Sequence, residues 1–392
     1  MLSRQSLSPR RGTIYARNGE PLAVSITRSK LIIDFGNDRF RRSKTYNNDA
    51  DTLARKLAAF FGDKSAKEYY EELISLRSKA IRTGKHISRA IFRDVDQNEW
   101  EEIRRYPLLR NGYNVTYSVQ ESGHRVYPQG NLALRTIGRA DRAKPYGIER
   151  GMNDTLQGKN GMQVWKVLAP GVKARIRHKD NVEVENGYDV VTTLDVDVQD
   201  VADNALQEQL IAQNAIWGTT IVMECATGDI LAMVNLRRNS KGEYTEGINY
   251  AVAQRMEPGS TMKLATTLIL LDKAHMSPEQ KYNSGYGKKV KVGKYNEVAD
   301  SHPIGTRKKP QIDLRTAFAE SANVYFLKAV IENFKGRETE YYNALCSLYL
   351  DRHPGLTELE QGANAVFLPK PGSAKWYGST LGLLSYGYGL EI

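Results

Sequence analysis

Ser260 and Lys263 stand three residues apart in the stretch EPGSTMK, at the head of an apolar run. Pro258 and Gly259 predict that a helix begins near Ser260, and residues at this spacing share one helix face. The hydroxyl then lies where backbone N–H groups are unpaired and the helix dipole is positive. Because a lysine in dry surroundings loses its proton more easily, the pair has the chemistry of a serine nucleophile with a lysine general base.

The same pair has a plainer interpretation. Ser260 also has the residue type of an ordinary helix N-cap, with Lys263 as a solvated lysine in the first turn. A Ser-x-x-Lys spacing occurs by chance in most long chains. The apolar helix argues against the plainer interpretation, because burying a lysine charge is costly.

A second polar group follows further along the chain. Ser321, Ala322 and Asn323 interrupt the otherwise apolar segment LRTAFAESANVYFLKAV at 314–330. Ser and Asn bond to their own backbone and so favour turns, which predicts a turn between two helices. The group is either an N-cap pair for the following helix or a proton-relaying hydroxyl beside a carboxamide that holds a substrate amide.

The elements around these residues begin with mixed strand and helix signals. Asn18-Gly19 between two apolar runs predicts a hairpin within 13–35. Apolar residues at helical spacing predict helices over 49–83 and 94–105. Residues 112–190 are glycine-rich, with short strand-like pieces.

The second half of the chain opens with a predicted helix and two strands. Residues 197–213 predict an amphipathic helix, and residues 217–236 predict two strands joined by a turn at 226–229. This order indicates mixed α and β structure packed in layers. The expected apolar face of the helix consists of Val198, Val201, Ala205 and Leu206.

Charge is unevenly distributed along the 392 residues. Residues 1–188 hold 35 Lys and Arg against 21 Asp and Glu, whereas residues 189–392 hold 21 against 24. We therefore predict two domains, 1–188 and 189–392. The basic first domain suits an anionic lipid surface, an anionic polymer or nucleic acid, or is simply a solvated face. Since no zinc-finger or aromatic RNA-binding signature occurs, we predict no nucleic-acid partner.

Composition argues against several other classes. Cys225 and Cys346 are too few for a disulfide framework, and the six histidines lack metal-ligand spacing, so we predict no metal site. The apolar run at 264–271 is too short to span a bilayer. The start of the chain lacks the apolar segment of a signal peptide, so the protein is either cytoplasmic or missing its first segment.

Ser-x-x-Lys followed by Ser-x-Asn resembles the signature of penicillin-binding proteins and serine β-lactamases. Other stretches are similar to segments of class B penicillin-binding proteins and follow one another in the family's order. No single stretch identifies the family, but the ordered set is specific to it. These stretches are RRGTIYARNGEPLA (10–23), GIERGMNDTLQGKNG (147–161), VVTTLDVDVQDVADNAL (190–206), ATGDILAMVN (226–235) and NYAVAQRMEPGSTMK (249–263).

The sequence also departs from the family pattern. Ala16 stands where Asp is usual, and Met256 where Tyr or Phe is common. The family's Lys-Thr-Gly or Lys-Ser-Gly motif does not occur, and the chain stops at SYGYGLEI (385–392), which resembles the segment that leads toward that strand. We therefore expect a fragment truncated at both ends, without its membrane anchor and nearly inactive alone.

The resemblance implies an α+β multidomain protein. A β-rich, dimerisation-type pedestal would precede an α/β/α transpeptidase domain that is incomplete at its C-terminus. The implied activity is peptidoglycan D,D-transpeptidation without a cofactor. Ser260 would attack the stem peptide, Lys263 would take its proton, Ser321 would protonate the leaving D-alanine, and Asn323 would position the substrate.

The resemblance also implies partners and a location. Expected ligands are stem peptides on lipid-linked or nascent glycan, and β-lactams. Expected partners are a membrane-embedded glycan polymerase and division proteins, at the outer, periplasmic face of the bacterial cytoplasmic membrane. Two alternatives stay open: a β-lactam-sensing or β-lactamase-like acyl-serine protein, and a non-catalytic scaffold of the division machinery.

Overall fold

The computed structural model of the protein describes residues 2–110, 115–169, 172–292, 296–352, 355–356, 359 and 366–392. The chain forms two compact units, whose segments alternate between residues 217 and 247. The domain boundary predicted between residues 188 and 189 lies earlier in the chain and stays a prediction. The first unit comprises Met1–Ile216, Thr220–Val234 and Arg238–Glu246, and the second comprises Trp217–Thr219, Asn235–Arg237 and Gly247–Ile392.

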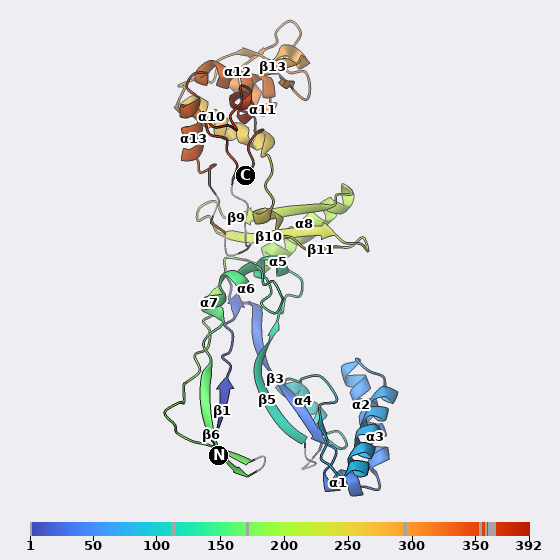
Figure 1. Ribbon diagram of the computed structural model, residues 1–392. Coiled ribbons are helices and arrows are strands. Elements are labelled where there is room, and N and C mark those ends of the chain that lie inside the picture. Colours follow the sequence, from blue (N-terminus) through green and yellow to red (C-terminus); the bar gives the residue numbers. More distant parts are fainter. Residues whose placement is uncertain are drawn as a thin grey trace. The chain divides into compact units, whose positions relative to one another are not determined.

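Two long antiparallel strands form the spine of the first unit. Figure 1 shows β3 (Pro21–Asp34) and β5 (Val115–Val126) side by side over most of their length. β2 (Ile14–Tyr15) turns into β3 at Asn18-Gly19, where Gly19 has a left-handed φ of 86°, so the predicted hairpin is confirmed. Two further short strands belong to this sheet: β4 (Ser88–Arg89) and β8 (Val190–Val191).

Helices pack against one end of β3. A buried cluster joins Leu31 and Ile33 of β3 to apolar side chains of these helices. The helix predicted over 49–83 is two helices, because Gly62 adopts a left-handed φ of 65° and a Ser65–Glu68 capping box starts the next one. The helices are α1 (Asp38–Arg42), α2 (Tyr46–Phe61), α3 (Ala66–Thr83) and α4 (Gln97–Ile103).

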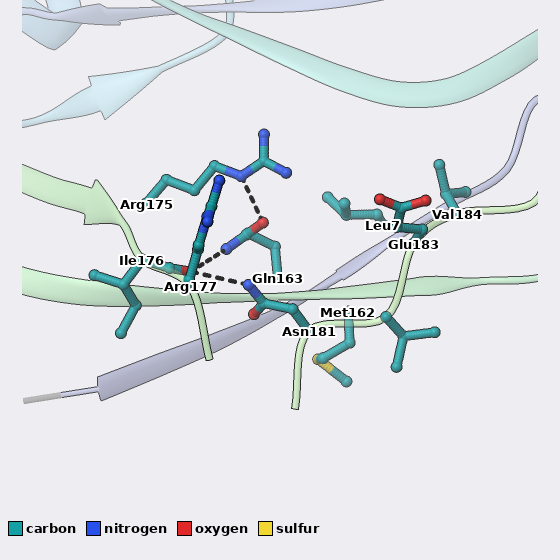
Figure 2. A pocket seen from close by; sticks show the side chains of 10 residues that line it. Leu7, Met162, Gln163, Arg175, Ile176, Arg177, Asn181, Glu183 and Val184 are labelled. Atoms are coloured by element: carbon teal, nitrogen blue, oxygen red, sulfur yellow. Dashed lines mark hydrogen bonds between the residues drawn. The ribbon is translucent and has the colours of Figure 1, made fainter. Parts of the chain in front are cut away.

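A second antiparallel sheet in the first unit has the order β1-β6-β7. A cavity of about 730 Å³ lies beside it, and Figure 2 shows Gln163 between Arg175 and Ile176 in its lining. The Gln163 amide is buried and satisfied: it donates to the Ile176 carbonyl at 3.1 Å and accepts from Arg175 Nε at 2.7 Å. Among the described residues that line this cavity, the charged side chains are Arg175, Arg177 and Glu183. The strands of this sheet are β1 (Leu2–Leu7), β6 (Gly161–Ala169) and β7 (Val172–Arg175). Three short helices precede β6 in the chain: α5 (Leu134–Ile137), α6 (Gly147–Gly151) and α7 (Asn153–Leu156).

The helix predicted over 197–213 is α8 (Val196–Ala212), and the residues of its predicted apolar face line one hollow together, but the buried face of the helix is a different one. Val201 is 69% exposed, whereas Gln199 is 2% exposed. The Gln199 amide exchanges two hydrogen bonds with the Met233 backbone, at 2.8 and 3.1 Å, which makes burial of this polar side chain favourable. The two predicted strands are confirmed within a sheet of order β11-β10-β9: β9 (Trp217–Met223), β10 (Ile230–Arg238) and β11 (Tyr244–Glu246).

Residues 247–392 of the second unit are mainly helical around a large apolar core, beside which lies a smaller buried cluster of Val298, Val324, Leu327 and Tyr386. Figure 1 shows α10, α11, α12 and α13 gathered together in it. No helix in the described ranges is both long and apolar enough to cross a bilayer. The elements are α9 (Tyr250–Ala253), α10 (Met262–Asp272), α11 (Leu314–Ala319), α12 (Asn323–Phe334), α13 (Glu338–Ser347), α14 (Thr380–Leu384), β12 (Tyr282–Asn283), β13 (Val290–Val292), β14 (Asn296–Val298) and β15 (Gln311–Ile312).

Candidate active site

Ser260 lies in a single 3₁₀ turn, Gly259–Thr261, that leads directly into α10. The helix start predicted near Ser260 is therefore confirmed. The Gly259 N–H donates to the Gly387 carbonyl at 3.0 Å, which fixes this turn from the far end of the chain. A Cβ on Gly387 would lie 1.8 Å from the Gly259 carbonyl oxygen, and its φ of 91° is left-handed, so only glycine fits there.

Packing of α10 buries Lys263. Met262 and Leu270 of the same helix belong to the core, and Thr266 donates to the Ser385 carbonyl at 2.9 Å. Lys263 is 2% exposed, whereas Ser260 is exposed. The interpretation of Lys263 as a solvated first-turn lysine is therefore wrong.

The Lys263 amine has four oxygen neighbours. Its Nζ lies 3.0 Å from Ser260 Oγ, 2.9 Å from Ser321 Oγ, 2.6 Å from the Ser321 carbonyl and 2.6 Å from Asn323 Oδ1. The structure thus brings all four predicted site residues together. An ammonium has three N–H groups, so at most three of these contacts can be donated by Lys263. If Lys263 is protonated, it cannot donate to both hydroxyls as well as to the carbonyl and the amide oxygen. If Lys263 is neutral, its nitrogen can accept a hydrogen bond from one of the two hydroxyls.

The charge on Lys263 is poorly compensated. Its contacts are hydroxyl, carbonyl and amide oxygens, none of which carries a formal charge. Burial lowers the pKa of Lys263 to about 8, against a smaller opposing effect of the Asp300 carboxylate. A lysine with this pKa is neutral in a useful fraction of molecules near neutral pH, which suits a general base.

Ser321 lies in the turn between α11 and α12, and Asn323 is the first residue of α12, which confirms the predicted turn between two helices. Ser321 has a left-handed φ of 55°, an unfavourable conformation for a residue with a side chain. Strained backbone of this kind is concentrated at functional sites, where surrounding structure enforces it. Here the turn directs both the carbonyl and the hydroxyl of Ser321 at Lys263.

Sequence reasoning missed Asp300. This side chain is 8% exposed, and its Oδ1 accepts a hydrogen bond from the Val324 N–H at 3.0 Å. Asp300 comes 24 residues before the helix that it contacts, so no local pattern marks it. The only signal was an acidic residue in the short stretch VADSHP, which has nothing specific to a site.

The site contains no metal-binding group of side chains. Within the described ranges, no cluster of three or more His, Cys, Asp or Glu is placed to hold a metal ion.

Comparison with known families gives two matches that follow each other along the chain. Residues 6–192 match the penicillin-binding protein dimerisation domain, and residues 218–392 match the penicillin binding protein transpeptidase domain. Ser260, Lys263 and the Ser321–Asn323 turn all fall within the second match.

Relatives match nearly the whole chain. "Probable peptidoglycan D,D-transpeptidase PenA" of Neisseria meningitidis serogroup A is 25% identical over 99% of the chain and 62% of its own length. "Peptidoglycan D,D-transpeptidase FtsI" of Buchnera aphidicola subsp. Schizaphis graminum is 24% identical over 99% of the chain and 63% of its length. The chain thus spans about three fifths of these relatives.

A solved structure agrees in fold. Penicillin Binding Protein 2X from Streptococcus thermophilus aligns with a TM-score of 0.68 and 20% identity, covering 100% of this chain and 57% of that one. Both the domain matches and this likeness support the predicted fold class, a dimerisation domain followed by a mixed helix-and-sheet transpeptidase domain. The chain therefore belongs to the class B penicillin-binding proteins.

Proposed function

We propose that this protein is a serine D,D-transpeptidase that cross-links peptidoglycan stem peptides, with Ser260 as its nucleophile. The observation that carries the proposal is the 3.0 Å contact between the buried Lys263 amine and the exposed Ser260 hydroxyl. The names of the two relatives, both peptidoglycan D,D-transpeptidases, support the substrate class.

In the proposed acylation step, neutral Lys263 takes the proton of Ser260 while Ser260 Oγ bonds to the carbonyl carbon between two terminal D-alanines. The Ser260 N–H, in the turn that opens α10, donates to the developing oxyanion. Asn323 holds the substrate amide. The bond to the last D-alanine then breaks.

The proposed proton path uses Ser321. Its hydroxyl lies 2.9 Å from Lys263 Nζ, within reach for relaying the proton to the nitrogen of the departing D-alanine. Lys263 is then neutral again. An amine of a neighbouring stem peptide then bonds to the acyl carbon and loses a proton to Lys263. The ester bond to Ser260 Oγ breaks, and Lys263 returns the proton to that oxygen, which completes the cross-link and frees Ser260.

Labelling with fluorescent penicillin tests this proposal in the complete gene product. We expect a stable covalent adduct at Ser260, because the β-lactam mimics the donor peptide, and no adduct in Ser260→Ala. Absence of label in the unaltered protein would favour a non-catalytic scaffold. Persistence of label in Ser260→Ala would exclude Ser260 as the nucleophile. Release of the adduct within seconds would favour a β-lactamase-like protein.

The cellular role is also part of the proposal. We infer a non-catalytic first domain, residues 1–188, and a catalytic domain, residues 189–392, acting at the outer face of the cytoplasmic membrane with a glycan polymerase and division proteins. The relatives' names support a role in cell-wall synthesis. Imaging of a fluorescent fusion tests the division role: enrichment at the septum supports it, and uniform labelling of the side wall contradicts it.

A further inference from the structure

Asp300 is a buried carboxylate beside the candidate active site. Its Oδ1 accepts from the Val324 N–H at 3.0 Å, but Oδ2 is buried and has no hydrogen-bond partner in the described part of the chain. A buried carboxylate oxygen without a partner is costly, since it has lost water and gained nothing in exchange. Retaining such a group at this position calls for a role that outweighs its cost.

The first role is visible in the geometry of α12. Ala322, at the position that normally caps the helix, offers no side-chain hydrogen bond, so Asp300 supplies the cap from a distant segment. The adjacent Ala299 carbonyl accepts from Asn323 Nδ2 at 3.2 Å. Two consecutive residues thus hold the first turn of α12 and orient the Asn323 amide. The oxygen of that amide lies 2.6 Å from Lys263 Nζ.

The second role concerns charge. Among the described residues, Lys263 on α10, Lys328 on α12 and His302 interact electrostatically with Asp300. The His302 ring in turn lies 3.1 Å from the Glu320 carboxylate, and both of these side chains are about half exposed. The Asp300 carboxylate raises the pKa of both lysines, against burial, which lowers them. Since only Lys263 contacts Ser260, the effect on Lys263 bears on the reaction.

We propose that Asp300 is a positioning residue that holds the Asn323 end of α12 and stabilises the ammonium formed when Lys263 accepts the Ser260 proton. In that step the serine O–H bond breaks, an N–H bond forms on Lys263, and the serine oxygen bonds to the acyl carbon. The ionised Asp300 carboxylate, although burial raises its own pKa, favours the new ammonium, because its charge is already in place when the proton moves. The catalytic part of this inference rests on the proposed function; the capping and charge effects do not.

Two substitutions separate the two roles. Asp300→Asn keeps an oxygen that can accept from Val324 but removes the charge, whereas Asp300→Ala removes both. We expect the Lys263 titration, followed by NMR of ¹³Cε-labelled lysine and assigned with Lys263→Met, to move to lower pH in both variants. The acid limb of the penicillin acylation profile should move with it in Asp300→Asn, and the plateau rate should fall roughly tenfold. In Asp300→Ala the plateau rate of acylation should fall roughly another tenfold, because Asn323 is no longer held in place.

Glu320→Gln is the matched control, because it removes a nearby carboxylate that is exposed and has no contact with Lys263. We expect it to leave the Lys263 titration and the acylation rate unchanged. An unchanged Lys263 titration in Asp300→Asn, or an equal shift in Glu320→Gln, would overturn the inference. If Asp300→Asn does not fold, Asp300→Ser provides an uncharged cap with the same expected outcome. Failure of the proposed function looks different: penicillin would not label the unaltered protein, while the lysine titration would still respond to Asp300→Asn.

Discussion

Glu149 in the first unit is buried between two guanidinium groups, whereas Lys263 in the second is buried among neutral oxygens. Glu149 is fully buried, and its carboxylate lies 2.7 Å from Arg11 Nε and 2.5 Å from Arg125 Nε. Lys263 is nearly as inaccessible, yet its four contacts are with hydroxyl, carbonyl and amide groups. The two units thus bury charge in opposite ways.

The difference separates a structural site from a chemical one. The Glu149 carboxylate is held by two guanidinium groups, and its loss leaves their partly buried positive charges without this partner. An ammonium surrounded by neutral acceptors is stabilised less, so its proton is easily released. The first arrangement fixes a fold, and the second provides a base that gains and loses a proton.

The largest expected effect is on catalysis in Lys263→Met. Without its base the Ser260 hydroxyl is a weak nucleophile, so we expect the rate of penicillin acylation to fall by at least about 10⁴-fold. The free energy of unfolding should stay the same or rise, because an apolar side chain of similar length replaces a poorly compensated amine. Acylation kinetics and urea unfolding of the same samples measure both. A rate within tenfold of the unaltered protein would exclude Lys263 as the base.

Glu149→Ala should have the opposite outcome. Removing the carboxylate leaves the partly buried Arg11 and Arg125 without this counter-charge, so we expect the first unit to lose about 3–5 kcal/mol of stability. The acylation rate of the protein that stays folded should not change, since the substituted residue belongs to the other unit. Denaturant unfolding followed by a probe in the first unit gives the result. A loss below about 1 kcal/mol would mean that these charges are not coupled as the distances indicate.

The contrast also predicts a pH dependence. The neutral form of Lys263 is the active one, so acylation should rise about tenfold per pH unit up to about pH 8 and then level off. Stability should change in the same direction. Between pH 8 and the ordinary lysine pKa, the unfolded chain binds a proton that the folded one does not, so the free energy of unfolding rises with pH. A flat acylation profile between pH 6 and 8 would contradict this account of Lys263.

The smallest expected effect comes from a neutral hydrogen bond behind the site. Tyr341 OH lies 2.9 Å from Thr266 Oγ1 on α10, and Thr266 is also bonded to the Ser385 carbonyl. In Tyr341→Phe the threonine keeps that second partner, so we expect a loss of about 1 kcal/mol of stability and less than a threefold change in acylation. Thermal unfolding and labelling kinetics measure the two. A much larger loss of rate would show that the core behind α10 controls the site more tightly than its charges do.

The sequence was informative wherever the governing interactions are local. The hairpin at Asn18-Gly19 and the turn between α11 and α12 both follow from residue preferences within a few positions. The Ser260–Lys263 spacing belongs to this class, because three residues along a helix fix the distance between two side chains. Such features depend on residues close in sequence and do not require contacts with distant segments.

The inaccurate or missing predictions depend on distant partners. Val201 is exposed and Gln199 buried because Met233, on another element, satisfies the glutamine amide. Gly387 is required because the Gly259 carbonyl oxygen approaches it too closely for any other residue. Neither partner can be identified from a pattern confined to one segment.

By itself, the sequence determined that a hydroxyl and an amine share the first turns of an apolar helix and that a Ser-Ala-Asn turn follows further on. Only the tertiary structure decided that Lys263 is buried and that the Asn323 amide lies 2.6 Å from its amine. Helix geometry is set by neighbours along the chain, whereas burial and the pKa that follows from it depend on every segment that excludes water. The reactivity of Lys263 is therefore a property of the folded unit, even though its position on the helix is a property of the sequence.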